Sequence, residues 1–201
     1  MKNYLLPATL ALAACAFAAN AKTTDLSWNY VSAGYARLTA DDIGYRNIEL
    51  NGQQYMASYA LTDIFFMQAK YLTLKGNFDV SDMVGLPMDT SELGLSLGMR
   101  QPIYASGEAF IQAGYSRSKV GIYGYNETSS NLQASTGVRF KLVADLELSG
   151  ALSYTNGDNS DSNTFADLTA RYMLTPMFDV YVNYQYDSDT SLFGGGVSLH
   201  F

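Results

Sequence analysis

The chain has 201 residues, of which 48% are hydrophobic, 13% aromatic and only 15% charged, with a formal net charge of -7. This length fits a single domain, and the 16 tyrosines, 10 phenylalanines and 17 glycines favour strands and turns. The acidic balance excludes a nucleic-acid surface, because neutralising phosphates needs clustered lysine and arginine. Cys15 is the only cysteine, which excludes an intrachain disulfide and a cysteine-based metal site.

The first 21 residues have the pattern of an export signal. Lys2 precedes an apolar stretch over residues 5–19, and Ala19-Asn20-Ala21 forms a small-x-small cleavage site. We expect cleavage after Ala21 and a mature domain over residues 22–201. The alternative is a lipobox at residues 12–15, which would make Cys15 the lipidated first residue; the apolar stretch that continues beyond Cys15 favours the later cut.

From residue 26 onward, apolar and polar residues alternate with a period of two, which is typical of strands. Short connections recur around Thr62, Pro102, Leu142 and Leu174, and the connections between them are longer, polar and acidic. This pattern predicts ten strands, with eight as the alternative count. The predicted strands are residues 26–39, 53–61, 64–74, 91–100, 107–118, 131–140, 146–155, 164–173, 178–186 and 191–201.

Four of the predicted strands, residues 91–100, 131–140, 146–155 and 178–186, carry charge on one face only. In residues 91–100, Leu93, Leu95 and Leu97 share one face, while Glu92 and Arg100 share the other. After the export signal, no apolar run approaches the length of a transmembrane helix, so the chain could cross a membrane only as a closed barrel of strands. A charge facing lipid at mid-depth costs about 2 to 4 kcal/mol, so the charged face of such a barrel must face the lumen. Because acidic and basic residues balance, we expect a paired lumen network of Arg37, Lys70, Glu92, Arg100, Glu108, Arg139, Glu147, Asp167, Arg171 and Asp179.

Aromatic residues are predicted to form two rings at the lipid-water interfaces. One ring, beside the short connections and the termini, consists of Trp28, Phe65, Phe140, Tyr172, Phe178 and Phe201. The other, beside the long connections, consists of Tyr55, Tyr71, Tyr115, Tyr154, Tyr186 and Phe193. In residues 26–39, Val31, Ala33 and Tyr35 are out of phase with Trp28 and Tyr30, which suggests a bulge.

The last predicted strand places Phe193, Val197, Leu199 and Phe201 on one apolar face, and the chain stops on the aromatic residue. Together with the export signal, short turns and acidic loops, this strand resembles the small outer-membrane barrels of Gram-negative bacteria, a group that includes OmpX, OmpW and the OmpA membrane domain. The resemblance implies an all-β, transmembrane, antiparallel up-and-down β-barrel, exported through the periplasm, with both termini on the periplasmic side. The strand count departs from the eight strands of those examples.

The same resemblance implies the partners. Phe193, Val197, Leu199 and Phe201 would be the signal read by the barrel assembly machinery, and outer-membrane lipids and lipopolysaccharide would surround the barrel. We expect a monomer. Deleting Phe201, or replacing it with Asp, should harm assembly far more than any loop substitution.

Candidate chemistry is sparse. His200 is the only histidine and lies beside the terminus, where we expect it to fill the lumen against a carboxylate. We therefore predict neither an enzyme nor a cofactor. The loop aspartates Asp158, Asp161, Asp187 and Asp189 are weak candidates for a divalent cation, but their spacing matches no complete calcium loop and favours solvated loops.

Two functions fit these features. The first is a structural or surface-interaction barrel whose work is carried by its long acidic extracellular loops. The alternative is a narrow channel or porin for ions or small solutes, because ten strands enclose slightly more space than the eight that side chains can fill.

Overall fold

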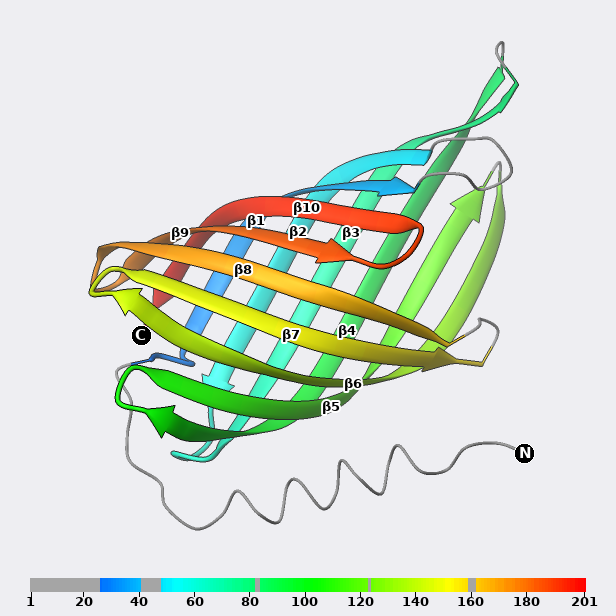
Figure 1. Ribbon diagram of the computed structural model, residues 1–201. Coiled ribbons are helices and arrows are strands. Elements are labelled where there is room, and N and C mark those ends of the chain that lie inside the picture. Colours follow the sequence, from blue (N-terminus) through cyan, green and yellow to red (C-terminus); the bar gives the residue numbers. More distant parts are fainter. Residues whose placement is uncertain (1–25, 41–47, 82–83, 123, 159–161) are drawn as a thin grey trace.

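The computed structural model describes residues 26–40, 48–81, 84–122, 124–158 and 162–201, and these residues form one closed β-barrel (Figure 1). The predicted export signal, its cleavage site and Cys15 lie outside the described residues. The barrel has ten strands: β1 (Tyr30–Ala40), β2 (Ile48–Ala60), β3 (Phe65–Ser81), β4 (Val84–Tyr104), β5 (Gly107–Ile122), β6 (Tyr125–Val143), β7 (Leu146–Gly157), β8 (Asn163–Thr175), β9 (Phe178–Tyr186) and β10 (Thr190–His200).

Every strand pairs antiparallel with its neighbours in sequence, and β1 pairs with β10 to close the barrel. At this seam Tyr30 lies opposite His200, and the Phe201 amide donates to the Asn29 carbonyl at 3.2 Å. Closure leaves no strand edge unpaired, which is the condition for a sheet that spans lipid. The predicted all-β up-and-down barrel of ten strands is confirmed.

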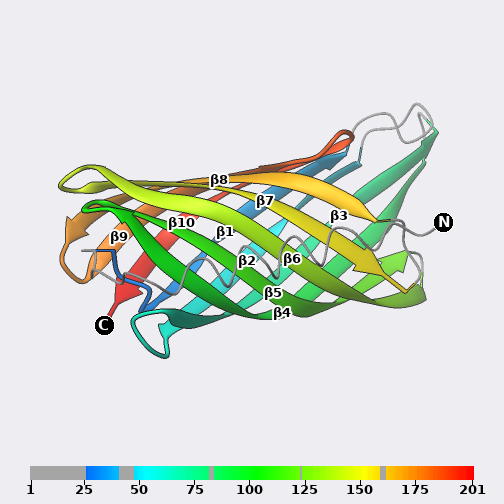
Figure 2. The same ribbon diagram turned by 60° about the horizontal axis from the view of Figure 1, so that its bottom comes forward.

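The two ends of the barrel differ. The C-terminus and the β2–β3, β4–β5, β6–β7 and β8–β9 turns lie at one end, which we call the short-turn end. The other five connections join the strands at the opposite end, which we call the long-loop end, and Figure 2 shows the strands wrapping obliquely between the two. Two of the short turns use the same local chemistry. Thr62 Oγ1 accepts the amide of Phe65 at 2.9 Å, and Thr175 Oγ1 accepts the amide of Phe178 at 3.1 Å. Threonine can hold such turns because its hydroxyl competes for nearby backbone amides.

Two of the predicted long loops are in fact hairpin arms. Residues 75–81 extend β3, and residues 84–90 extend β4, so that this hairpin projects beyond the rest of the barrel (Figure 1). In the same way β5 and β6 continue to Ile122 and from Tyr125. The prediction failed there because turn-forming and acidic residues occur within both arms, and cross-strand pairing outweighs their low strand propensity.

The faces of the strands follow the alternation. Leu93, Leu95 and Leu97 on β4 are exposed on the outside, whereas Ser116, Ser153 and Asp179 on other strands are buried inside. A belt of exposed Leu, Val, Tyr and Phe surrounds the outer wall, as is typical of a barrel that spans a membrane. No helix among the described residues is long and apolar enough to cross a membrane.

Strand β1, for which the sequence suggested a bulge, is regular. β1 pairs with both neighbours over residues 30–40 without any register shift, so the expected bulge is absent. Val31 and Tyr35 face outward, and Trp28 and Tyr30 are buried inside. Trp28 therefore does not belong to the interfacial ring in which the sequence pattern placed it. The other residues of both predicted rings are exposed on the outer surface: Tyr55, Phe65, Tyr71, Tyr115, Phe140, Tyr154, Tyr172, Phe178, Tyr186, Phe193 and Phe201.

Candidate functional site in the lumen

The short segment before β1, residues 26–29, lies inside the short-turn end of the barrel. Trp28 is only 2% exposed, and its ring centroid lies 3.9 Å from that of Phe66 on β3 and 5.6 Å from that of Phe110 on β5. Because β1 and β5 are four strands apart in the barrel, the indole reaches across the lumen. Its Nε1 donates to Glu108 Oε2 at 2.6 Å, which satisfies the only polar atom of the ring.

Two ion pairs hold this indole. The Arg139 guanidinium lies 4.3 Å from the Trp28 ring centroid, donates to the Ser27 carbonyl at 3.0 Å and pairs with Glu147 at 2.7 Å. Arg100 pairs with Glu108 at 3.4 Å. Buried charges are tolerated when they are paired, and cations favour the face of an indole. We call Leu26, Trp28, Phe66, Phe110, Arg100, Glu108, Arg139 and Glu147 the Trp28 plug.

A second charged cluster lies beside the seam. Asp179 is fully buried, and its Oδ2 lies 3.2 Å from Arg171 Nη1 and 2.5 Å from His200 Nε2. Arg171 also donates to Ser198 Oγ at 2.7 Å, and its guanidinium lies 4.3 Å from the Tyr30 ring centroid. Serine, histidine and aspartate thus meet here, but the serine is engaged by arginine and all three are buried. The cluster is built to join β1, β8, β9 and β10.

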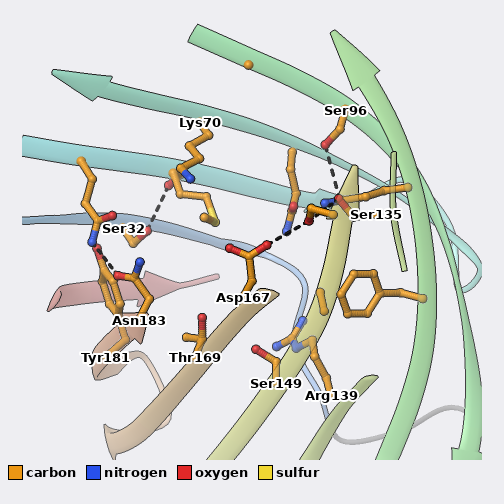
Figure 3. A pocket seen from close by; sticks show the side chains of 18 of the residues that line it. Ser32, Lys70, Ser96, Ser135, Arg139, Ser149, Asp167, Thr169, Tyr181 and Asn183 are labelled. Atoms are coloured by element: carbon orange, nitrogen blue, oxygen red, sulfur yellow. Dashed lines mark hydrogen bonds between the residues drawn. The ribbon is translucent and has the colours of Figure 1, made fainter. Parts of the chain in front are cut away.

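Between these clusters and the long-loop end lies a polar cavity of about 190 Å³ (Figure 3). Its walls carry mainly hydroxyl and amide side chains. One hydrogen bond crosses the seam region, where Gln54 Nε2 on β2 donates to Asn183 Oδ1 on β9 at 2.8 Å. A polar volume of this size, lined by such groups, suits ordered water or a small hydrophilic solute.

Charged side chains from opposite strands face each other across the cavity. Asp167 on β8 and Lys70 on β3 both point into it (Figure 3). Ser153 Oγ lies 2.9 Å from both Asp167 Oδ2 and Ser135 Oγ, so it donates to the carboxylate and accepts from its neighbour. Glu92 lines the same cavity.

The long-loop end of the lumen is closed on one side by apolar side chains. Leu74 on β3 and Leu50 on β2 are almost completely buried, and Leu192 on β10 joins them across β1. We call the group the apolar cluster; its members are Ala36, Ala40, Ile48, Leu50, Leu72, Leu74 and Leu192, with Leu38 and Met88 packed against it. The sequence did not reveal this cluster, because apolar residues on an inward face interrupt the expected alternation of apolar outward and polar inward residues.

The structure places nine of the ten predicted lumen charges inside the barrel and one outside. Arg37 shares the outward phase of Val31 and Tyr35, and it pairs with Glu49 at 2.6 Å, the two side chains being 55% and 50% exposed. The prediction for Arg37 was wrong because it followed from the wrong phase for Trp28. Of the ten predicted lumen charges, four cations and five carboxylates therefore lie in the lumen, with His200 as an additional partner for Asp179.

The predicted loop aspartates are not gathered into a cation site where they are described. Asp187 Oδ1 accepts the amides of Asp189 and Thr190 at 3.0 and 2.7 Å, and its Oδ2 accepts from Asn163. This carboxylate holds the β9–β10 turn. Asp158 is described but lies outside any cluster of three metal-ligating side chains among the described residues, and Asp161 falls outside them.

The final strand has the predicted faces. Phe193, Val197 and Phe201 are exposed on the outer wall, and Leu199 shares their phase, while Ser198 and His200 are buried inside. Two important lumen residues were not found from the sequence, Trp28 as a plug and Tyr181 as a wall of the cavity. The phase break at Trp28 and Tyr30 was the available signal for the first.

No protein-family model and no curated protein sequence matches this chain. Among solved structures, the porin NanC aligns with a TM-score of 0.53 at 11% identity, over 86% of this chain and 100% of the porin. Neisserial surface protein A aligns with a TM-score of 0.49 at 15% identity, over 87% of this chain and 98% of that one. Ail of Yersinia pestis aligns with a TM-score of 0.43 at 14% identity, over 86% and 97%.

At such identities the likeness shows the fold and leaves function open. The fold agrees with the apolar belt, the closed seam and the outward-facing terminal phenylalanine. The protein is thus a closed ten-stranded barrel with the fold of small outer-membrane β-barrel proteins such as the porin NanC.

Proposed function

We propose that this protein is an outer-membrane barrel with a closed lumen, which acts at the cell surface rather than as an open pore. The observation that carries the proposal is the Trp28 plug. An indole that is 2% exposed and held by Arg139 and Glu108 occupies the short-turn end of the lumen. A pore that is always open would need a continuous hydrated path there.

The apolar cluster supports the same proposal from the other end. Leu50, Leu74 and Leu192 are buried near the long-loop ends of their strands, where an open pore would have hydrated side chains. Water in contact with aliphatic walls is unfavourable, and apolar constrictions are known to close pores by dewetting. The polar cavity therefore lies between the Trp28 plug and a long-loop end that the apolar cluster closes on one side.

The surface part of the proposal rests on the projecting hairpins. The β3–β4 and β5–β6 arms carry the chain beyond the apolar belt, and Tyr125 at one tip is 83% exposed beside the partly exposed Ile122. Gly124, with a φ of 86°, allows the tight turn between them. An aromatic and an aliphatic side chain at an exposed tip form a contact surface rather than a core.

Single-channel recording in planar bilayers tests the closed lumen. We expect the folded protein to give no discrete conductance steps, with folding verified by its heat-modifiable migration on a detergent gel. Reproducible steps from the unmodified protein would contradict the proposal.

The second candidate function is a narrow channel that is gated by the Trp28 plug. The observation that favours it is the polar cavity of about 190 Å³ with Lys70 and Asp167 inside, which a purely structural barrel does not need. The variant Trp28→Ala separates the two functions. A gated channel should conduct once the indole is removed, whereas a lumen that is also closed by the apolar cluster should stay silent.

Tyr35→Ala is the matched control for that variant, because Tyr35 is an aromatic residue close by in the chain but exposed on the outer wall. Its removal should leave the recording unchanged under either function. Conductance in Tyr35→Ala as well as in Trp28→Ala would point to general loosening of the barrel rather than to a gate.

A further inference from the structure

Three exposed cations lie on the outer wall near the long-loop end of β3 and β5. Lys75 on β3 and Arg117 and Lys119 on β5 face outward, in the same phase as Tyr71 and Tyr115 of the aromatic ring. The strand between them, β4, pairs Leu93 with Arg117, Ser91 with Lys119 and Asp89 with Lys75. The three cations therefore flank one strand.

These cations lie directly beyond the ring of tyrosines. Arg117 is two residues beyond Tyr115, whereas Lys119 is four beyond Tyr115 and Lys75 four beyond Tyr71. At about 3.3 Å per residue, these steps are about 7 and 13 Å along the tilted strands. Because tyrosines of such a ring lie at the lipid-water interface, the cations are at the depth of lipid headgroups.

The protein leaves these charges available. In the lumen Arg100, Arg139 and Arg171 each have a carboxylate partner within 4 Å. Lys75, Arg117 and Lys119 form no ion pair with any described residue, although Asp89 is the cross-strand neighbour of Lys75. Three cations and one carboxylate give this patch a positive charge on a chain whose net charge is -7.

The opposite half of the wall has no such patch. On β6–β10, the outward positions near the long-loop end carry no lysine or arginine among the described residues. Thr128, Ser130, Asn156, Thr164 and Ser191 are uncharged, and the exposed Asp158 and Asp189 beside them are acidic. Among the described residues, outward cations near this end are thus confined to β1–β5, where Arg37 is already paired with Glu49. If these cations served only to keep the barrel rim hydrated, we would expect them on all sides of the barrel.

Below the cations the wall is unusually aliphatic. Leu93, Leu95 and Leu97 form an exposed ladder along β4, between Tyr71 on β3 and Tyr115 on β5. Leucines in this position offer a smooth contact for acyl chains, and the tyrosines border it on both sides. The cations and the ladder together describe one amphipathic surface, with positive charge at headgroup depth and apolar area at chain depth.

We propose that the outer face of β3–β5 is a binding site for a phosphorylated, multiply acylated lipid of the outer leaflet. Lys75, Arg117 and Lys119 would hold its phosphate groups, because charge-assisted hydrogen bonds to phosphate are the strong ones. The β4 leucine ladder would receive its acyl chains. The site goes beyond the closed-lumen proposal and does not depend on whether the lumen conducts.

Native mass spectrometry of the folded mature protein, titrated with lipid A, tests this site. The comparison is the triple variant Lys75→Gln, Arg117→Gln and Lys119→Gln. We expect its apparent affinity for lipid A to fall about tenfold or more, since one lost charge-assisted contact already corresponds to about that factor. Dephosphorylated lipid A should bind the unmodified protein about as weakly as lipid A binds the triple variant.

The double variant Arg37→Gln and Glu49→Gln is the matched control, because it removes a cation from the same rim that is already neutralised. Its affinity for lipid A should stay within about twofold of the unmodified protein. Equal binding by the triple variant, equal binding of dephosphorylated lipid, or equal binding of phosphatidylglycerol would each overturn the site. If the triple variant does not fold, as judged by the loss of heat-modifiable migration, the single variants Arg117→Gln and Lys119→Gln are measured instead. Each should then bind lipid A more weakly than the unmodified protein, and equal binding by both would overturn the site.

Discussion

Both ends of the lumen contain buried side chains, but of different chemistry. At the short-turn end, rings and ion pairs contributed by the segment before β1 and by β3–β10 interlock around Trp28, Arg139, Arg171 and Asp179. At the long-loop end, aliphatic side chains from β10, β1, β2 and β3 pack without any charge. The same barrel thus uses directional contacts at one end and non-directional contacts at the other.

This difference suggests different roles in folding. An ion pair in a poorly hydrated lumen is stabilising only when its geometry is right, so the charged end is satisfied only in the correct strand register. Apolar contacts are less demanding of geometry and tolerate repacking. We infer that the short-turn end defines register and closure at the seam, whereas the long-loop end contributes burial.

The largest effect is expected from Asp179→Ala. It would leave Arg171 buried without its carboxylate and His200 without its neighbour. Breaking a buried pair from one side costs about 3 to 5 kcal/mol. Urea unfolding in lipid vesicles, followed by the fluorescence of the single tryptophan, measures this loss. Asp189→Ala in the β9–β10 turn is the control and should change the free energy of unfolding by less than about 0.5 kcal/mol.

Leu74→Ala tests the other end. Leu74 is fully buried in the apolar cluster, and its truncation should lower the free energy of unfolding by about 2 to 5 kcal/mol through lost burial and a residual cavity. Leu95→Ala on the lipid-facing wall is the control, because lipid chains can fill the space that it leaves. If Leu95→Ala lowered the free energy of unfolding more than Leu74→Ala does, the apolar cluster would not be a main contributor to stability.

A smaller effect, specific to the plug, is expected from Gly98→Ala. A Cβ at Gly98 would overlap the Phe66 ring, with its nearest heavy atom at 2.2 Å, and Phe66 supports Trp28. Overpacking of this kind costs about 1 to 3 kcal/mol. Gly94→Ala on the same strand and face meets nothing closer than 3.6 Å and should be tolerated. Quenching of Trp28 fluorescence by acrylamide should rise in the first variant only.

The smallest loss of stability is expected from Arg37→Gln, which tests whether a surface ion pair contributes less than the ion pairs in the lumen. Arg37→Gln removes a pair of the same type as those in the plug, but on a rim where both side chains are about half exposed to solvent. Exposed pairs contribute about 0 to 1 kcal/mol and are screened by salt. At low salt, the free energy of unfolding of Arg37→Gln should be slightly lower than that of the unmodified protein, and at high salt the two should be equal. A loss as large as that of Asp179→Ala would refute the distinction between lumen and surface ion pairs.

Much of the barrel was predictable from the sequence because lipid imposes a strict rule on each strand. Charge must face the lumen at mid-depth, so the alternation on residues such as Leu93, Leu95 and Arg100 determines the phase without knowledge of any contact. The outward Phe201 and the inward His200 follow from the same rule. Ten strands follow from the two alternating kinds of connection.

Only the tertiary structure decided what fills the interior. An aromatic residue is acceptable both at the lipid interface and inside a ten-stranded lumen, so the alternation could not tell where Trp28 points. That one ambiguity reversed the phase of the first strand and misplaced Arg37. The pairing of Asp179 with Arg171, the apolar cluster and the cation patch beside β4 depend on cross-strand register, which the period of two within each strand does not contain.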